Sequence, residues 1–266
     1  MKEMKREATD KFVIEKLPWS AKGRKEPKRK KPIPFPLPVL NNQTGLAWNL
    51  LARRESGKST LIANLIRVYY PYVSQVIILS PTVFNDSTYD AILEWSNVSA
   101  SDTVTNAQID AVFQMQSSYD RRDPDSDQVL LIVDDSSDDF KRSSLRKGLI
   151  KLYTRGRHSG IHFIVACHGI TFLEGSMVSN SLQWCLWDVN RHALKQLCAK
   201  IATREMNEND LEDFIANNTK KPYSFVFINY KDPYGNKYYI GFDTPYEIPG
   251  GQDVLERGEK NLVTSQ

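Results

Sequence analysis

From Gly45 onward, short hydrophobic runs alternate with segments whose apolar positions recur at helical spacing. Runs rich in β-branched residues are typical of strands that are buried on both faces of a parallel sheet. The pattern predicts strands at 46–51, 76–80, 129–135, 161–166 and 182–187. It predicts helices at 61–70, near 107–119 and from 191 to about 218, with further helical patterns between the later strands. Strands that alternate with helices indicate a mostly parallel sheet with helices on both faces.

The C-terminal part of this pattern has a different character. Two more apolar runs, 224–230 and 237–242, flank the turn signal DPYGN, and this arrangement predicts a β-hairpin that closes the sheet. The stretch 85–127 is less regular, and residues 249–266 lack periodicity, which is typical of a flexible tail. The predicted fold class is therefore α/β, with a C-terminal β-hairpin.

The N-terminal segment differs from the rest in charge. Residues 1–34 contain twelve Lys or Arg and five Asp or Glu, a net charge of +7, which leaves 3 − 7 = −4 for the remainder. The basic run 22–31 is followed by the proline-rich stretch 32–38, which favours an extended linker. Three interpretations stay open for this arm: a tether for DNA, a nuclear-import signal, or a solubilising tail without a partner.

These patterns divide the chain into an arm with its linker (1–44), one α/β domain (45–248) and a tail (249–266). Hydrophobic residues at 41% and charged residues at 25% are typical of a globular protein, and no apolar run has the length of a membrane span. We therefore expect an intracellular protein with no membrane partner. The three cysteines, Cys167, Cys185 and Cys198, form no C-x-x-C pair, so we expect reduced, buried thiols rather than disulfides or a zinc site.

A phosphate-binding loop is indicated between the first predicted strand and the first predicted helix. The pattern G-x-x-x-x-G-K-[ST] is matched at Gly57, Lys58 and Ser59. Gly57 permits close approach of the backbone, Lys58 neutralises the β- and γ-phosphates, and the hydroxyl of Ser59 binds Mg²⁺. Thr60 is expected to begin the helix, whose N-terminal end also attracts anions. The residues expected to contact the nucleotide are Arg54, Glu55, Ser56, Gly57, Lys58, Ser59 and Thr60.

This loop departs from the pattern at two positions. Ala52 replaces the first glycine, which is a mild change unless the backbone there has a positive φ. Glu55 places a carboxylate where many such loops have another glycine. Because a carboxylate that faces a triphosphate would be repelled, we expect Glu55 to point to solvent or to pair with Arg53 or Arg54.

A pair of acids completes the candidate site. The apolar run 129–135 ends in Asp134 and Asp135. A phosphate loop needs an acid at the end of a neighbouring strand to hold the shell of the Mg²⁺ ion, and Asp134 is the candidate for that role. Asp135 is the candidate base that orients the attacking water. The joint presence of the loop and the acids, in this order, favours an ATP and Mg²⁺ site over a chance match.

The segment TRGRHSGIHFIVACHG, residues 154–169, completes a resemblance that covers roughly 46–187. The order of phosphate loop, acidic strand, Arg-His segment and sensor strand resembles the viral DNA-packaging ATPases of the FtsK/HerA superfamily, of the poxvirus, giant-virus and virophage type. The resemblance implies a P-loop ATPase fold. It also implies a motor that hydrolyses ATP and threads double-stranded DNA into a preformed capsid. Such motors work as homo-oligomeric rings, commonly hexamers, and contact DNA mainly through its phosphates.

The resemblance also assigns roles to three further residues. His168 occupies the end of the strand where the family usually has a glutamine that senses the γ-phosphate, and this departure puts the sensor role in doubt. Arg155 and Arg157 match the position of an arginine that a neighbouring subunit inserts to stabilise transition-state charge. A solvated basic turn that binds nothing is the other interpretation of these arginines.

Other functions stay open at this point. A protein of a different class, which binds DNA or capsid without hydrolysing ATP, would have a decayed phosphate loop, with Ala52, Glu55 and His168 as its marks. Another P-loop enzyme, such as a helicase, would share the same site. A nucleotide kinase is less favoured, because the sequence has no arginine-rich lid segment. For a packaging motor we expect capsid proteins as partners and a location in the host nucleus or cytoplasm, with association with the virion.

Overall fold

The computed structural model describes residues 33–34, 36–40, 45–123, 125–135, 143–169, 173, 175–232 and 236–248. The basic run of the N-terminal arm and the C-terminal tail lie outside these described residues. The predicted boundaries at 44 and 248 therefore stay predictions.

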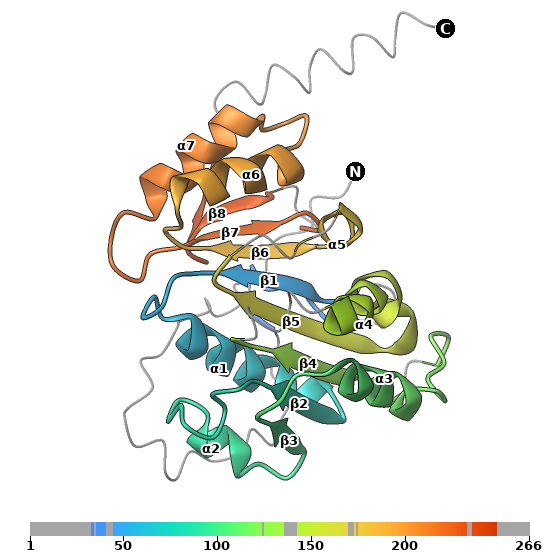
Figure 1. The fold of residues 1–266 in the computed structure, drawn as a ribbon. Helices are drawn as coiled ribbons and strands as arrows, with labels where there is room; N and C mark the ends of the chain where they lie inside the picture. The colour runs from blue at the N-terminus through green and yellow to red at the C-terminus, as the bar shows by residue number, and fades with distance from the viewer. Residues whose placement is uncertain are drawn as a thin grey trace, which may run out of the picture.

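The described residues form a nine-stranded sheet in the order β3-β2-β4-β5-β1-β6-β7-β8-β9 (Figure 1). The parallel strands are β1 (Ala47–Leu51), β2 (Gln75–Leu79), β3 (Val98–Ser101), β4 (Val129–Val133), β5 (Ile161–Cys167) and β6 (Gln183–Leu186). The antiparallel strands are β7 (Val226–Asn229), β8 (Tyr238–Ile240) and β9 (Thr244–Pro245). The predicted α/β fold class and the predicted C-terminal hairpin are both confirmed.

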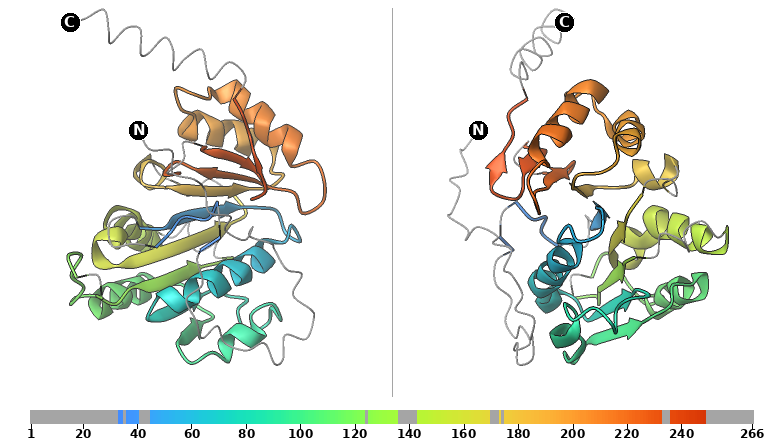
Figure 2. Two further views of the ribbon diagram at one scale, coloured as in Figure 1. Left: turned by 180° about the vertical axis from the view of Figure 1, so that it is seen from behind. Right: turned by 60° about the vertical axis from the view of Figure 1, so that its left-hand side comes forward.

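Helices cover both faces of this sheet (Figure 2). One face carries α1 (Lys58–Tyr69), η1 (Tyr70–Tyr72) and α2 (Asp90–Leu93). The other face carries α3 (Asn106–Met115), α4 (Ser143–Arg155), η3 (Gly156–Ser159), α5 (Gly175–Ser179), α6 (Arg191–Ile201) and α7 (Glu208–Asn218). None of the helices in the described part of the chain is long and apolar enough to cross a membrane.

The hydrophobic run of β4 shows why these strands lack hydrophobic-polar alternation. Successive side chains of a strand point to opposite faces of the sheet. Leu131 and Val133 pack into the core on one face, and Leu130 and Ile132 pack into the core on the other. All four are fully buried, as the unbroken apolar run predicts for a strand covered by helices on both sides.

Two sequence predictions of elements need correction. The helical segment predicted from 191 to about 218 is two helices, because α6 ends at Ile201 and α7 begins only at Glu208. The side chain of Asn207 caps α7 by accepting hydrogen bonds from two backbone N–H groups. In addition, α1 begins at Lys58, two residues before Thr60, so Lys58 and Ser59 belong to the first turn of the helix.

Part of the proline-rich stretch is packed onto the domain. Ile33 and Leu37 are buried in the same core as α1. The hydroxyl of Tyr69 donates a hydrogen bond of 3.0 Å to the carbonyl of Pro38. This stretch is therefore anchored to the domain at Ile33, Leu37 and Pro38, whereas the sequence predicted an extended linker.

The cysteines are buried and form no disulfide, as predicted. Burial raises the pKa of Cys167 to about 12 and that of Cys198 to about 12. These thiols therefore stay protonated near neutral pH and pack as small apolar side chains.

Candidate active site

Three adjacent parallel strands bring the sequence-predicted residues to one edge of the sheet. Strands β4, β5 and β1 are neighbours, so their carboxyl ends lie side by side. The backbone N–H of Ala52 donates 3.1 Å to the carbonyl of Cys167, and that of Asp134 donates 3.0 Å to the carbonyl of Leu79. The phosphate loop, the two acids and His168 therefore meet at this edge, which we call the carboxyl edge.

The backbone of the loop explains its two departures from the pattern. Ala52 does not have a positive φ, so an alanine fits where the pattern has its first glycine. Glu55 has a φ of 60°, in the left-handed region that glycine occupies without strain. Gly57, with a φ of 89°, caps α1 and aims the N-terminal end of the helix at the loop. The glutamate at position 55, where many such loops have glycine, therefore strains the backbone.

The side chain of Glu55 is exposed, which is one of the two arrangements that the sequence predicted. Arg53 pairs with Asp188 at 3.3 Å rather than with Glu55, and both partners are more than half exposed. An ion pair this exposed adds little stability. Ser56 braces the loop from within, because its hydroxyl donates 2.8 Å to the carbonyl of Arg53.

The ammonium group of Lys58 contacts the carboxylate of Asp134. Both residues are almost fully buried, with exposed fractions of 7% and 1%. Taking two charges out of water is costly, and it is tolerated where each charge neutralises the other. The lysine of the loop and the acid of β4 therefore form one electrostatic unit.

Tyr89 also belongs to the site, although the sequence analysis did not identify it. Its hydroxyl donates a hydrogen bond of 2.8 Å to the second carboxylate oxygen of Asp134, and the side chain of Ser59 lies beside the same hydroxyl. Burial first, and then the charge of Asp134, raises the pKa of Tyr89 well above its usual value, so the phenol stays protonated and donates. Tyr89 precedes α2 in the irregular stretch 85–127, where no periodic signal indicates that it is buried.

His168 is bound on both sides. Its Nδ1 lies 2.7 Å from the carbonyl of Ala52, and its Nε2 lies 2.8 Å from a carboxylate oxygen of Asp135. His168 therefore links the phosphate loop, through Ala52, to the second acid that follows β4. Asp135 itself has a φ of 52°, a second strained residue at this edge.

Ser59 and Asp134 have the chemistry to hold a magnesium ion. Mg²⁺ takes oxygen ligands and is usually held in proteins by one or two carboxylates together with substrate phosphates and water. The carboxylate of Asp134 accepts a hydrogen bond from the hydroxyl of Tyr89, and the side chain of Ser59 lies beside the same hydroxyl, so Ser59 and Asp134 lie close together. The two residues therefore fit an ion that arrives with the nucleotide.

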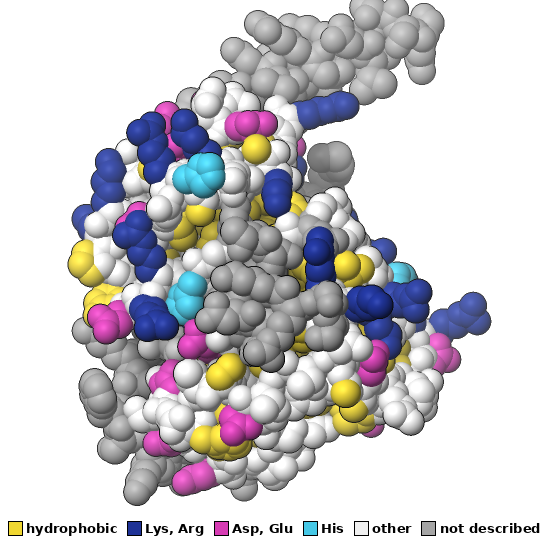
Figure 3. All heavy atoms as spheres, viewed as in Figure 1, with side chains coloured by type: hydrophobic (Ala, Val, Ile, Leu, Met, Phe, Trp, Pro, Cys, Tyr) yellow, Lys and Arg dark blue, Asp and Glu magenta, His cyan; other side chains and the backbone are white. Residues whose placement is uncertain are grey.

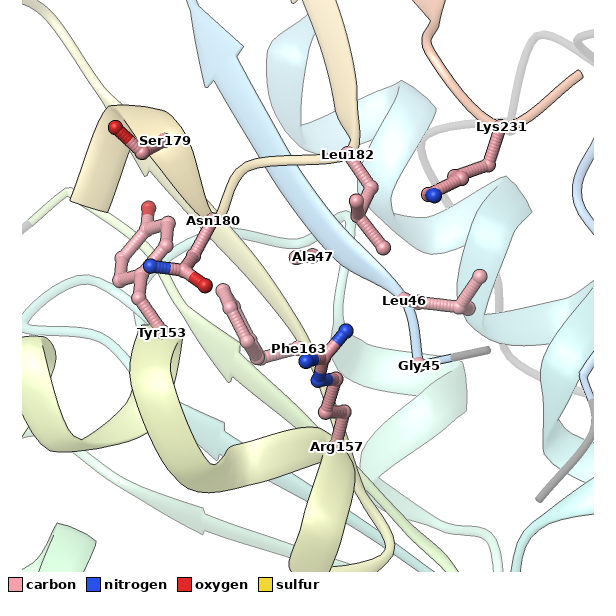
Figure 4. Close-up of a pocket in the computed structure, with 10 residues that line it drawn as sticks. All are labelled: Gly45, Leu46, Ala47, Tyr153, Arg157, Phe163, Ser179, Asn180, Leu182 and Lys231. Atoms are coloured by element: carbon pink, nitrogen blue, oxygen red, sulfur yellow. The ribbon is translucent and has the colours of Figure 1, made fainter. Parts of the chain in front are cut away.

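The structure does not bring Arg155 and Arg157 to this site. Arg155 ends α4 and Arg157 lies in η3, and both precede the start of β5. The seven residues of β5 separate them from the carboxyl edge by roughly 20 Å. Arg157 instead lines a cavity of about 180 Å³ at the amino ends of the parallel strands, which we call the amino edge, and Lys231 lines it too (Figure 4). Within one chain, neither arginine reaches the phosphate loop.

Neither a protein-family model nor a curated protein matches this sequence. Several solved structures are similar to it. The genome packaging NTPase B204 from Sulfolobus turreted icosahedral virus 2, in complex with AMP, has a TM-score of 0.51 and 16% identity, over 76% of this chain and 98% of that chain. B204, the DNA-packaging ATPase from Sulfolobus turreted icosahedral virus, has a TM-score of 0.50 and 16% identity, over 68% of this chain and 91% of that chain.

A secretion protein is similar as well. The cytoplasmic domain of the type VII secretion ATPase EccC from Thermomonospora curvata has a TM-score of 0.53 and 13% identity, over 78% of this chain and 25% of that chain. At these identities the likeness is one of fold. The chain therefore has the α/β fold of these packaging and secretion ATPases, which is the fold that the sequence resemblance implied.

Proposed function

We propose that this protein is an ATP-hydrolysing motor that moves double-stranded DNA into a viral capsid. The observation that carries the proposal is the joint placement of the loop, the buried Lys58–Asp134 pair and the His168–Asp135 pair at one edge of the sheet. These are the parts that a phosphate-loop ATPase needs. The fold shared with genome-packaging ATPases supports packaging as the task.

The proposed nucleotide site uses backbone and side chains together. The N–H groups of residues 54–60 and the N-terminal end of α1 bind the phosphate oxygens. Lys58 turns from Asp134 towards the β- and γ-phosphates, because the triphosphate offers it more negative charge than a single carboxylate does. Ser59 and Asp134 would hold the Mg²⁺ ion, which would neutralise negative charge on the phosphates.

Asp135 is the proposed base for the attacking water. The water oxygen forms a bond to the γ-phosphorus while the bond to the β,γ-bridging oxygen breaks, and the water proton passes to Asp135. His168 holds the carboxylate of Asp135 at 2.8 Å and is itself anchored on Ala52. In this proposal His168 positions the base, which differs from the direct γ-phosphate sensing of the family's glutamine.

In a ring of subunits, Arg155 and Arg157 could act on the nucleotide of a neighbouring subunit, although they do not reach the phosphate loop of their own chain. The triphosphate of a neighbouring subunit, placed against η3, would lie within reach of Arg155 or Arg157. Both arginines are exposed, as contact with a neighbour requires. A homo-oligomeric ring, commonly a hexamer in the family that the sequence resembles, is therefore part of the proposal.

Exposed cations support contact with DNA phosphates. Lys and Arg side chains gather over α6 and α7 and again around α4 and η3 (Figure 3). The exposed cations of α4 and η3 are Arg146, Lys147, Arg155 and Arg157. Contacts of this kind bind DNA without reading its sequence, as a translocating motor requires. Capsid proteins as partners, and a location in the host cell or with the virion, complete the proposal.

The test is ATP turnover with and without double-stranded DNA, for the wild type, Lys58→Ala and Gln114→Ala. We expect turnover that DNA stimulates in the wild type and in Gln114→Ala, whose uncharged side chain is exposed on α3, and none in Lys58→Ala. Circular dichroism checks that Lys58→Ala folds, because this change leaves buried Asp134 without its cation. DNA binding without turnover in the wild type would instead favour the non-hydrolysing class. Strand separation rather than translocation would favour a helicase.

A further inference from the structure

Tyr223, in the connection between α7 and β7, lies against the phosphate loop. Its Cδ1 is 3.4 Å from the position that a Cβ atom on Gly57 would occupy. The residue is nevertheless 68% exposed. A large aromatic ring thus stands beside the last glycine of the loop with much of its surface open to solvent.

The stability of the fold does not account for this placement. Tyr223 has a φ of 63°, and the left-handed backbone is unfavourable for a residue with a Cβ atom. Exposure also forgoes the burial that makes an aromatic ring stabilising. In the described part of the chain, the other non-glycine residues with a positive φ are Glu55 and Asp135, and both belong to the candidate site. Strain of this kind clusters where a site needs a particular geometry.

The order of the strands tells which end of a nucleotide would face Tyr223. Asp134 and Asp135 follow β4, on one side of β1, so the γ-phosphate end lies on that side. Strands β6 and β7 lie on the other side of β1. Because β7 is antiparallel to β6, its first residue lies at the carboxyl edge, and the register pairs Leu186 with Val226. Tyr223, which precedes β7, therefore stands on the nucleoside side of the loop.

We infer that the ring of Tyr223 stacks on the base of the bound nucleotide, so that the α7–β7 connection forms the base-binding side of the site. This inference rests on the proposed nucleotide site. A base is a flat π-system, and stacking on an aromatic ring stabilises it whatever its identity. The ligand class is therefore a nucleoside triphosphate, with the base held by stacking and the phosphates held by the loop.

The test compares ATP with inorganic tripolyphosphate, which has the phosphates but no base. Binding of each is measured by calorimetry for the wild type, Tyr223→Phe and Tyr223→Asn. Asparagine is chosen because it adopts the left-handed backbone more readily than most residues, so the connection keeps its course. Tyr223→Asn should weaken ATP binding about 5- to 150-fold, since base stacking contributes about 1–3 kcal/mol. Tyr223→Phe should bind both ligands as the wild type does, and tripolyphosphate should bind all three proteins equally.

Phe84 provides a matched control. It is 57% exposed and follows β2, on the Asp134 side of the site, so Phe84→Asn should leave the binding of both ligands unchanged. Equal losses of ATP and tripolyphosphate in Tyr223→Asn would overturn the inference, because the ring would then act on the loop rather than on the base. Unchanged ATP binding in Tyr223→Asn would overturn it as well. If Lys58→Ala bound both ligands as tightly as the wild type, the proposed nucleotide site itself would fail, and the inference with it.

Discussion

The two ends of the parallel strands are built on different principles. At the carboxyl edge, Glu55, Asp135 and Tyr223 have left-handed backbones without being glycine. The same edge holds a buried cation, Lys58, against a buried acid, Asp134. Each of these features destabilises the folded protein. The backbone conformations and the burial of charge at this edge thus go against what these residue types prefer.

At the amino edge, local geometry follows local preference. The left-handed residue there, Gly160, is a glycine with a φ of 63°. His162, buried at the start of β5, accepts a hydrogen bond from the backbone N–H of Leu46 and stays neutral, because burial lowers its pKa to about 4. Arg155 and Arg157 are exposed rather than held in a buried pair. The difference fits the ligand site that we propose at the carboxyl edge and the contacts with a neighbouring subunit and DNA that we propose for the exposed arginines of the amino edge.

The largest expected effect at the carboxyl edge comes from Asp135→Asn. Without a base to accept the proton of water, turnover of ATP should fall by about 100-fold or more. The affinity for Mg²⁺ and ATP should stay within a few-fold, because Lys58, Ser59 and Asp134 are untouched. Asp127→Asn is the matched change, since Asp127 is exposed at the other end of β4. Near-normal turnover in Asp135→Asn, or an equal loss in Asp127→Asn, would show that the two edges do not differ in the proposed way.

His162 tests the stability of the amino edge by its pH dependence. The pKa of His162 is about 4 in the folded protein and 6.5 in the unfolded chain. Between these pH values the imidazole is protonated in the unfolded chain and neutral in the folded protein. The contribution is complete above pH 6.5 and is lost as the pH falls towards 4, by about 3 kcal/mol in total. His162→Gln keeps an acceptor for Leu46 but does not titrate. Urea unfolding of both proteins at pH 7 and pH 4 should therefore show a smaller loss in the variant, and equal losses would contradict the prediction.

Tyr89→Phe should have an intermediate effect. The change removes a donor to the charged Asp134, and hydrogen bonds to charged groups contribute about 1.5–3 kcal/mol. We expect a free energy of unfolding lower by about 2 kcal/mol and a higher Mg²⁺ requirement for turnover. Tyr153→Phe is the comparison, because its buried hydroxyl donates to the neutral Asn49. That variant should lose about 1 kcal/mol of stability and keep the Mg²⁺ requirement. If the Mg²⁺ requirement changed in both variants, or in neither, the assignment of Tyr89 to the site would be wrong.

The smallest effect should come from Glu55→Gly, which should raise the free energy of unfolding rather than lower it. Glycine relieves the left-handed strain, about 1–2 kcal/mol, but loses more entropy on folding, so the net gain in stability should be about 1 kcal/mol or less. The loss of one negative charge near the triphosphate should lower the KM for ATP about two- to threefold. Gly160→Ala, at the amino edge, should destabilise instead, since its Cβ would lie 2.5 Å from Tyr119. Thermal unfolding and ATP titration measure both changes, and a destabilised Glu55→Gly would contradict the strain argument.

Much of the fold could be predicted from the sequence because buried strands are visible as short apolar runs along the chain. The run VLLIV of β4 is short, apolar throughout and rich in β-branched residues, which favours a strand covered on both faces. The turn DPYGN between apolar runs predicted the hairpin of β7 and β8 for a similarly local reason. By contrast, β3 has the sequence VSAS, and such a short, polar edge strand carries no hydrophobic signal. It forms because β2 offers it backbone hydrogen bonds.

The chemistry of the site divides in the same way. The sequence by itself determined that Gly57, Lys58 and Ser59 follow the spacing of a phosphate loop and that two acids end a later apolar run. Such a loop needs particular residue types at fixed spacing, so the sequence alone could predict it. Only the tertiary structure decided that Tyr89 holds Asp134, that His168 holds Asp135 and that Tyr223 stands beside Gly57. These partners are 33 to 166 residues apart along the chain. Contacts over such separations depend on the order of the strands in the sheet, and no local pattern of residues encodes that order.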